Sequence, residues 1–345
     1  MIPVAGRRVM LVGGAGFIGH NLALRLHELG ATVTVLDSLA VNNVYSVRRD
    51  LPEGLDPDLY LRILQQRTDL LRSAGIEVMV LDSRDYHAMS HAARQVDPQV
   101  LVHLAAVAHA DRSNKDPHST FDHSLRTLEN SLDISRSTHL GVEHLIYFSS
   151  SMVYGNFAAE SVTEDTACEP LGIYGALKFA GEKMVIAYNQ VFGVPYTIVR
   201  PSALYGERCI SRRVGQIFIE NALQGRDVRI NGDGSDRLDF TYIRDLVEGV
   251  VKVMEHGDGG ARNEIFNLTY GESRSIAQMA DILAREFPGI AIEYLPKDRL
   301  VPKRGTLSVA KARRLIGYEP AWPLERGYPE YVRWYRSIHP AAVTA

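Results

Sequence analysis

Cysteine is scarce in this chain of 345 residues, where only Cys168 and Cys209 occur. Two thiols cannot form a disulfide framework or a four-thiolate metal site, so both are expected to be reduced. The histidines show no metal-like spacing to carboxylates or thiols. These absences exclude a disulfide-stabilised scaffold, and we expect no metal site.

The chain also lacks an excess of positive charge, a long apolar run and the start of a secreted protein. Its formal net charge is −3 at pH 7, which leaves no basic footprint for nucleic acid. The longest apolar runs, such as residues 100–108, are far shorter than a membrane span. The first residues lack the basic-then-apolar order of a signal peptide. We expect a cytoplasmic protein without nucleic-acid or membrane partners.

Short apolar runs alternate regularly with amphipathic stretches along the first two thirds of the chain. Residues 8–12, 32–36 and 100–104 are typical of buried strands, and residues 17–29 carry apolar side chains at helical spacing. Strands that alternate with helices predict an α/β fold with a Rossmann-type doubly wound parallel sheet.

The pattern changes after Arg200, where glycine and charged residues become frequent. With a chain of this length, the change predicts a Rossmann domain in residues 1–205 and a smaller α/β lobe in residues 206–345. We expect the chain to cross between them more than once. Residues 42–68, with two prolines and several charges, predict an insertion after the second strand.

A glycine-rich turn follows the first predicted strand. Gly13, Gly16 and Gly19 have the spacing G-x-x-G-x-x-G. The first glycine permits a tight turn, the second lets a pyrophosphate approach the backbone, and the third lets helix and strand pack closely. The N-terminus of the following helix offers free amides and a positive dipole end to phosphates. The turn therefore predicts a dinucleotide site in the first domain.

Asp37 ends the second predicted strand and indicates which dinucleotide is bound. An acid at this place accepts hydrogen bonds from the adenosine ribose. Its carboxylate would repel a 2′-phosphate, so the sequence favours NAD over NADP as the cofactor.

Tyr174 and Lys178 lie four residues apart in a stretch of helical character, so their side chains share one helix face. A free phenol titrates near pH ~10. A neighbouring ammonium and an oxidised nicotinamide both favour phenolate, so Tyr174 would act as a general base near neutral pH. Lys178 would lower that pKa and bind the nicotinamide ribose. Upstream, Ser149 to Ser151 follow a strand at the sheet edge where ligands bind.

With these residues and further motifs, the chain resembles the nucleotide-sugar epimerases and dehydratases of the extended short-chain dehydrogenase/reductase family. The resemblance covers residues 9–334 and is closest to UDP-glucose 4-epimerase. Its motifs are residues 13–19, Asp37, residues 81–85, 103–106 and 149–155, Tyr174 with Lys178, and residues 200–206, 232–235 and 239–245.

The resemblance implies a set of cofactor contacts and a catalytic group. Ser150, four residues before the tyrosine of V-Y-G, would be the catalytic hydroxyl beside Tyr174 and Lys178. Asp82 and Ser83 would contact the adenine. The implied NAD contacts are Gly13, Gly16, Phe17, Ile18, Gly19, Asp37, Ser38, Asp82, Ser83, Leu104, Ala105, Ala106, Tyr174, Lys178 and Pro201.

The two residues that follow Ser150 bear on which reaction the resemblance implies. The family's 4,6-dehydratases carry Asp and Glu there, whereas this chain has Ser151 and Met152. A thioether cannot transfer protons, so water elimination is disfavoured. We expect NAD-dependent epimerisation of a nucleotide-diphosphate sugar, with a UDP-sugar as substrate, at C4 through a 4-keto intermediate.

Other outcomes stay open. A dehydratase, decarboxylase or ketoreductase of the same family is the first alternative. A non-catalytic dinucleotide-binding regulator is the second, and the intact Ser150, Tyr174 and Lys178 argue against it. Because the family commonly pairs through two helices per subunit, here residues 120–138 and 173–191, we expect a homodimer.

Departures from the family motifs concern the substrate. Ala203 stands where the family has Asn, and Leu238 stands where an Arg grips the diphosphate, with Arg237 displaced by one. Either Arg237 reaches the diphosphate from a shifted backbone, or another cation replaces it. Gly305 would leave room for a larger sugar substituent such as N-acetyl. The candidate substrate contacts are Arg112, Ser151, Met152, Ala203, Arg208, Arg237, Arg299 and Arg304.

Overall fold

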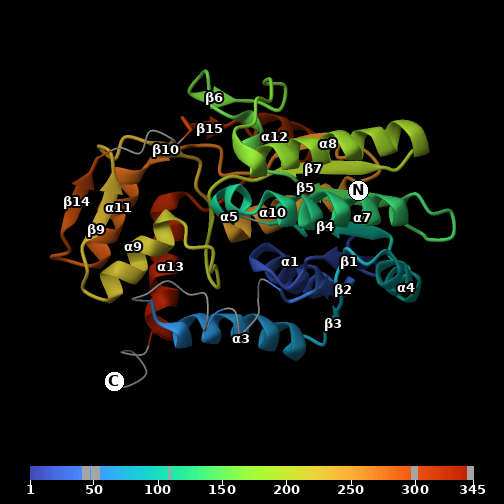
Figure 1. The fold of residues 1–345 in the computed structure, drawn as a ribbon, viewed down its shortest axis with the longest axis horizontal. Helices are drawn as coiled ribbons and strands as arrows, with labels where there is room; N and C mark the ends of the chain where they lie inside the picture. Colours follow the sequence, from blue (N-terminus) through green and yellow to red (C-terminus); the bar gives the residue numbers. More distant parts are fainter. Residues whose placement is uncertain (41–46, 48–54, 108–109, 297–301, 340–345) are drawn as a thin grey trace.

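The computed structural model describes residues 1–40, 47, 55–107, 110–296 and 302–339. In this part of the chain, seven parallel strands form the central sheet in the order β12-β7-β5-β4-β1-β2-β3 (Figure 1). The strands are β1 (Arg8–Val12), β2 (Thr32–Asp37), β3 (Glu77–Val80), β4 (Val100–His103), β5 (His144–Phe148), β7 (Tyr196–Arg200) and β12 (Glu264–Asn267). The strand order reverses at β1, which is the doubly wound topology of the Rossmann fold. The predicted fold class is confirmed.

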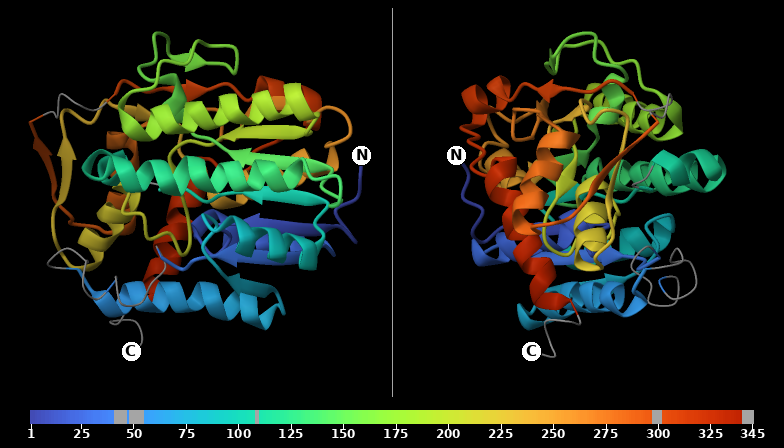
Figure 2. Two further views of the ribbon diagram at one scale, coloured as in Figure 1. Left: turned by 45° about the vertical axis from the view of Figure 1, so that its right-hand side comes forward. Right: turned by 90° about the vertical axis from the view of Figure 1, so that its left-hand side faces the viewer.

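Helices cover both faces of this sheet (Figure 2). Alternate residues of β1 point to opposite faces, so Val9 and Leu11 enter one apolar core while Met10 and Val12 enter another. The first core is covered by α1 (Phe17–Glu28), α10 (Ile243–Glu255) and α12 (Ala310–Ile316). The second is covered by α4 (Tyr86–Val96), α7 (Thr127–Ser135) and α8 (Gly172–Phe192).

A third apolar core lies in the C-terminal lobe. Its main elements are α9 (Val214–Leu223), β9 (Val228–Asn231), α11 (Ile276–Glu286), β14 (Ile292–Leu295) and α13 (Leu324–Ile338). Helix α3 (Pro57–Ser73), within the predicted insertion, also packs into this core through Leu59, Tyr60, Ile63 and Leu64. The Tyr60 hydroxyl donates to Glu220 Oε1 on α9 at 2.8 Å, so the insertion ties the two parts of the molecule together.

The chain crosses between the two parts, as expected from the sequence. Strand β12 and helix α10 follow residue 206 but complete the Rossmann sheet and its cover. In the other direction, β6 (Ser161–Val162) pairs with β15 (Thr306–Leu307). A single boundary between residues 205 and 206 therefore does not separate the apolar cores of the two parts.

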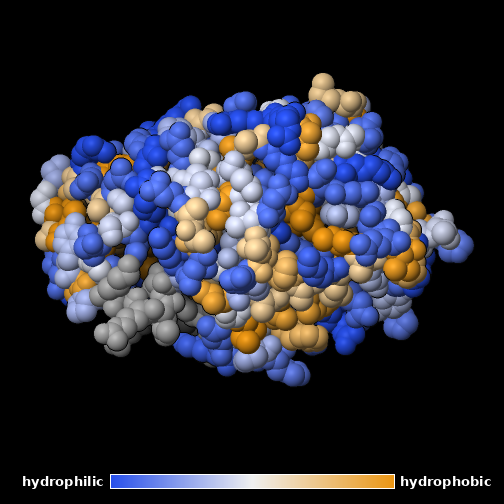
Figure 3. Space-filling model, turned by 90° about the horizontal axis from the view of Figure 1, so that it is seen from above, coloured by the Kyte–Doolittle hydropathy of each residue, from blue (hydrophilic) through white to orange (hydrophobic). Residues whose placement is uncertain are grey.

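The remaining elements are short. They are α5 (Ala110–Lys115), α6 (Pro117–Phe121), the π-helix η1 (Asp122–Arg126), the 3-10 helix η2 (Ser151–Tyr154), β8 (Leu204–Tyr205), β10 (Arg237–Leu238), β11 (Thr241–Tyr242) and β13 (Arg274–Ser275). Seen from above, the surface is mostly hydrophilic with hydrophobic patches between (Figure 3). None of the described helices combines the length and apolar character that crossing a bilayer requires.

Candidate active site

The glycine turn joins β1 to α1 and leaves space where a pyrophosphate would approach. A Cβ atom at Gly13 would lie 2.7 Å from the Ala105 nitrogen, and one at Gly19 would lie 2.4 Å from the Gly14 oxygen. At Gly16, by contrast, a Cβ would meet only the Gly13 oxygen at 3.6 Å. Gly16 caps α1 without a side-chain hydrogen bond, which leaves the first helix amides for a ligand. The turn therefore fits the pyrophosphate of NAD.

Asp37 lies half-buried at the end of β2, next to this turn. Its Oδ2 accepts a hydrogen bond from the Ala15 nitrogen at 2.9 Å, and its Oδ1 accepts one from the Leu39 nitrogen at 2.8 Å. Burial raises the pKa of the carboxyl, while these two N–H groups and the Arg67 guanidinium oppose the rise. The two backbone contacts hold the carboxylate beside the phosphate turn, where an adenosine ribose would reach it.

The other predicted cofactor residues line the same edge of the sheet. Leu104 to Ala106 follow β4, and the Pro201 oxygen, after β7, accepts from the Ser151 nitrogen at 2.9 Å. Asp82 is ion-paired with Arg84 at 2.6 Å, which lowers the pKa of its carboxyl. The Ser83 oxygen accepts from Asn130 at 2.9 Å. Phe17 and Ile18 begin α1, and Ser38 is exposed just after β2.

Ser150, Tyr174 and Lys178 come together at the carboxyl ends of β5 and β7. Ser150 caps η2, its Oγ accepting from the Met152 nitrogen at 3.2 Å, and its hydroxyl acts to lower the pKa of the Tyr174 phenol. Tyr174 is near the start of α8, and Lys178 lies one turn later on the same helix. The Lys178 ammonium is buried, donates to the Phe148 oxygen at 2.7 Å and lies 5.3 Å from the centre of the Tyr147 ring.

The positive charge that acts on the Tyr174 phenol comes from a different residue than the sequence predicts. Burial raises the pKa of the phenol above its ordinary value, and the charge that opposes this rise is the Arg213 guanidinium. Lys178 was expected in that role, but its ammonium is directed at the Phe148 carbonyl. Burial also lowers the pKa of Lys178 to about 8, against the attraction of Glu182.

Two arginines from distant parts of the chain flank these groups. Arg304 Nη1 donates to the Ser151 oxygen at 2.7 Å, and its Nη2 contacts the Met152 sulfur. Burial, together with the nearby Arg213 guanidinium, lowers the pKa of Arg304 to about 10. Arg213 itself is exposed at the start of α9. Two cations thus share the space beside Tyr174, which favours an anionic group of the substrate there.

Two other predicted arginines are already engaged elsewhere. Arg237 donates from Nε to Ser273 Oγ at 3.0 Å and from Nη2 to the Ser273 oxygen at 2.6 Å. Arg208 donates from Nε to His20 Nε2 at 3.0 Å, so it is tied to helix α1. Both contacts hold the guanidinium by hydrogen bonds within the protein. Whether either arginine binds the diphosphate in place of the family arginine at Leu238 stays a prediction.

Three further substrate expectations have different outcomes. Ala203 has φ 37°, in the left-handed region where Asn is tolerated better than Ala, so the departure from Asn places strain at this turn. A Cβ at Gly305 would lie 2.4 Å from the Glu160 oxygen, so this glycine serves a close backbone approach. Arg299 and the side chain of Arg112 lie outside the described residues.

Comparison with known proteins places this geometry in a family. The model of the NAD dependent epimerase/dehydratase family matches residues 9–269. The chain belongs to this family. The matched range includes the glycine turn, Asp37 and the Ser150–Tyr174–Lys178 group.

Similar proteins have related activities. UDP-glucuronate 4-epimerase 1 of Arabidopsis thaliana is 30% identical over 352 residues, covering 97% of this chain and 78% of the relative. A putative UDP-glucose 4-epimerase of Methanocaldococcus jannaschii is 28% identical over 335 residues, covering 95% and 98%. The crystal structure of Thermus thermophilus UDP-glucose 4-epimerase with NAD is 26% identical with a TM-score of 0.79, covering 95% and 99%.

These comparisons confirm the predicted family, the NAD cofactor and the enzyme class. The chain is an NAD-dependent nucleotide-sugar epimerase of the C4 type. When bound, NAD+ accepts a hydride from the sugar and returns it. The roles of the single residues, the nucleotide base and the oligomeric state stay predictions.

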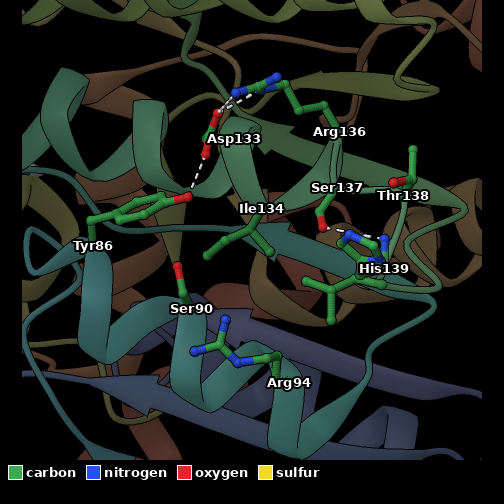
Figure 4. Close-up of a pocket in the computed structure, with 10 residues that line it drawn as sticks. Tyr86, Ser90, Arg94, Asp133, Ile134, Arg136, Ser137, Thr138 and His139 are labelled. Atoms are coloured by element: carbon green, nitrogen blue, oxygen red, sulfur yellow. Dashed lines mark hydrogen bonds and ion pairs between the residues drawn. The ribbon is translucent and has the colours of Figure 1, made fainter.

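A surface pocket of about 490 Å³ between α4 and α7 is separate from this site (Figure 4). Tyr86 and Ser90 of α4 face Asp133 of α7 across it, and the Tyr86 hydroxyl donates to Asp133 Oδ2 at 2.7 Å. None of the predicted catalytic or cofactor residues lines it. No group of three or more metal-binding side chains occurs among the residues described.

Sequence reasoning missed the buried groups behind Lys178. Glu182 and Arg200 form a buried ion pair at 2.7 Å, and His103 lies against Ser131 at 2.9 Å. The spacing of four between Lys178 and Glu182 is a signal that points to the carboxylate. The arginine of the R-P motif was noted only as part of a family pattern.

Proposed function

We propose that this enzyme epimerises a UDP-linked sugar at C4, with Tyr174 as the proton-transfer group. The observation that carries the assignment of roles is the position of Ser150, which lowers the pKa of the Tyr174 phenol, beside the dinucleotide edge of the sheet. The phenol takes the proton of the C4 hydroxyl, while the Ser150 hydroxyl holds the same oxygen. Lys178 binds the nicotinamide ribose, and the Arg213 guanidinium supplies positive charge near the phenol.

The nucleotide assignment is supported by the relatives. The Arabidopsis and Methanocaldococcus proteins are named for UDP-sugars, and the Thermotoga maritima UDP-glucose 4-epimerase, 26% identical with a TM-score of 0.78, was crystallised with UDP-glucose. Met152 after Ser151 also supports epimerisation over water elimination, because a thioether donates and accepts no protons.

The test of the proposed function is product analysis by NMR. The purified enzyme is offered UDP-glucuronate, UDP-glucose and UDP-N-acetylglucosamine in separate reactions. The proposal expects one of these to be converted to its 4-epimer without loss of water or carbon dioxide and without free NADH. Release of water, of carbon dioxide or of stoichiometric NADH would instead assign a different reaction to the site.

Arg213 and Arg304 are proposed to hold the diphosphate in place of the family arginine that Leu238 replaces. Among the described residues, Arg304 contacts the Ser151 oxygen and the Met152 sulfur and is repelled by Arg213, so an anion between the two arginines would relieve the repulsion. Arg304→Met is therefore expected to raise KM for the UDP-sugar by roughly tenfold to a hundredfold, as expected for one lost charged hydrogen bond. Steady-state kinetics measures this.

Arg237→Met is the matched control, because Arg237 is held by Ser273. Its KM should change by less than about threefold, within the scatter of a surface substitution. If Arg237→Met raised KM more than Arg304→Met did, the binding of the diphosphate would be assigned to Arg237 and not to Arg304.

A homodimer is also proposed, formed through α8 and the α6–α7 segment. Large apolar side chains remain exposed there, with Val191 at 71%, Phe121 at 50% and Phe192 at 49%. Exposed apolar surface of this kind marks interaction sites. Light scattering at micromolar concentration should give twice the chain mass of 38.4 kDa. A monomer mass, unchanged by Val191→Asp, would contradict the assignment.

A further inference from the structure

A buried carboxylate lies one helical turn beyond Lys178. Glu182 follows Lys178 by four residues on α8, and its side chain is 1% exposed. Both of its oxygens are engaged. Oε1 accepts from Ser149 Oγ at 2.5 Å and from Arg200 Nε at 2.8 Å, and Oε2 accepts from Arg200 Nη2 at 2.7 Å. The carboxylate is thus fixed between α8 and the ends of β5 and β7.

The arginine is anchored on its other side. Arg200 Nη1 donates to the Tyr154 hydroxyl at 2.9 Å, and that hydroxyl donates to Asn267 Oδ1 at 2.8 Å. A buried ion pair of this kind is weak evidence for stability, because removing both charges from water costs about as much as their attraction returns. The position of this ion pair, one helical turn beyond Lys178, suggests that it has a role other than stability.

Lys178 is in an environment that disfavours its charge. Burial lowers the pKa of its ammonium to about 8, and Glu182 is the group whose charge opposes this. The other titratable groups that face Lys178 are neutral. The pKa of His103 is lowered to about 3 by burial and by Lys178, while burial raises the pKa of both Tyr147 and Tyr174.

We propose that Glu182 is a positioning residue that keeps the Lys178 ammonium charged and in place, and that Arg200 sets the strength of this effect by partly neutralising the carboxylate. The inference rests on the proposed role of Lys178 in the epimerase. Glu182 does not itself contact the reacting groups, since Ser149 and Arg200 occupy its oxygens, so its effect on the reaction passes through Lys178.

The proposal predicts the response of Lys178 to each change of charge. Glu182→Gln removes the negative charge and leaves Arg200, so the pKa of Lys178 should fall by about one unit or more. The double substitution Glu182→Gln with Arg200→Met removes both charges, so the pKa should lie between those of the single variant and the wild type. Tyr154→Phe removes a hydrogen bond to Arg200 but no charge, so the pKa should stay at the wild-type value.

The experiment is an NMR titration of the lysine side chains. The chain has only seven lysines, so ¹³C labels at Cε give few signals, and Lys178→Arg assigns the one that matters. The titration midpoint of Lys178 is then compared in the wild type, Glu182→Gln, the double variant and Tyr154→Phe. If Glu182→Gln does not fold, the double variant, which leaves no unpaired buried charge, gives the same test, and its midpoint should lie below that of the wild type.

The dependence of kcat on pH is measured beside the titration. In Glu182→Gln, the loss of activity at high pH should begin about one unit lower, since uncharged Lys178 no longer makes its charged hydrogen bond to the nicotinamide ribose. A midpoint in Glu182→Gln or the double variant equal to that of the wild type would overturn the proposal and leave the ion pair a structural role. It would not affect the proposed function, which fails only if the wild-type enzyme produces no 4-epimer.

Discussion

Tyr174→Phe is expected to lower kcat by a factor on the order of 10²–10⁴ while the protein still binds NAD. The substitution removes only the phenolic oxygen, which is the proposed proton-transfer group and whose pKa Ser150 acts to lower. The aromatic ring stays, so α8 keeps its packing. Stopped assays of 4-epimer formation measure kcat, and isothermal titration of the same protein with NAD measures the dissociation constant.

Tyr188→Phe is the matched control for this result. Tyr188 is on the same helix and packs against Phe192, with the ring centres 5.3 Å apart and the ring planes tilted by 55°. Losing its hydroxyl should leave kcat within about twofold of the wild type. If Tyr174→Phe and Tyr188→Phe had the same kcat, Tyr174 would not carry the proton.

Lys178→Met is expected to lower kcat about a hundredfold and to weaken NAD binding by roughly tenfold to a hundredfold. The ammonium is proposed to supply a charged hydrogen bond to the nicotinamide ribose, and one such bond is worth about 1.5–3 kcal/mol. Methionine fills a similar volume, so the buried site stays packed. The two constants are measured as for Tyr174→Phe.

Lys183→Met provides the comparison on the same helix. Lys183 is exposed, and its ammonium lies 4.8 Å from the centre of the Phe179 ring, on the outside of α8. Both constants should stay near their wild-type values. An unchanged NAD dissociation constant in Lys178→Met would show that Lys178 does not bind the nicotinamide ribose.

Much of the fold follows from local patterns in the sequence. The predicted helix at residues 17–29 and strand at 32–36 agree with α1 and β2 within one residue at each end, because apolar spacing and flanking glycines define both. The predicted helix at 120–138 is in fact split into α6, the π-helix η1 and α7, since a single π-turn leaves the apolar spacing nearly unchanged.

The catalytic group was predictable because each member follows a strand or lies on one helix face. Parallel strands bring their carboxyl ends to one edge, so Ser150 after β5 meets Tyr174 at the start of α8. The arginines could not be placed in this way. Arg213 and Arg304 come from segments far apart in the chain, and their meeting depends on how the C-terminal lobe packs on the sheet.

Contacts between residues far apart in the chain also explain the other features that the sequence did not predict. The partner of Glu182 is eighteen residues away on β7, and no local pattern specifies that contact. Arg237 seemed one residue from the family position, yet Ser273 on the neighbouring strand segment holds it. Helix α3 begins at Pro57 within the insertion, but its packing into the core of the C-terminal lobe depends on α9 and α13.

The most direct test of the central claim uses the UDP-sugar that the enzyme converts, labelled with deuterium at C4 and incubated with the wild-type enzyme in ordinary water. A hydride that leaves C4 and returns within one active site should leave the deuterium at C4 of the 4-epimer, with no label in the solvent. Replacement of the deuterium by hydrogen from water would contradict this account, because it would require a different way of inverting C4.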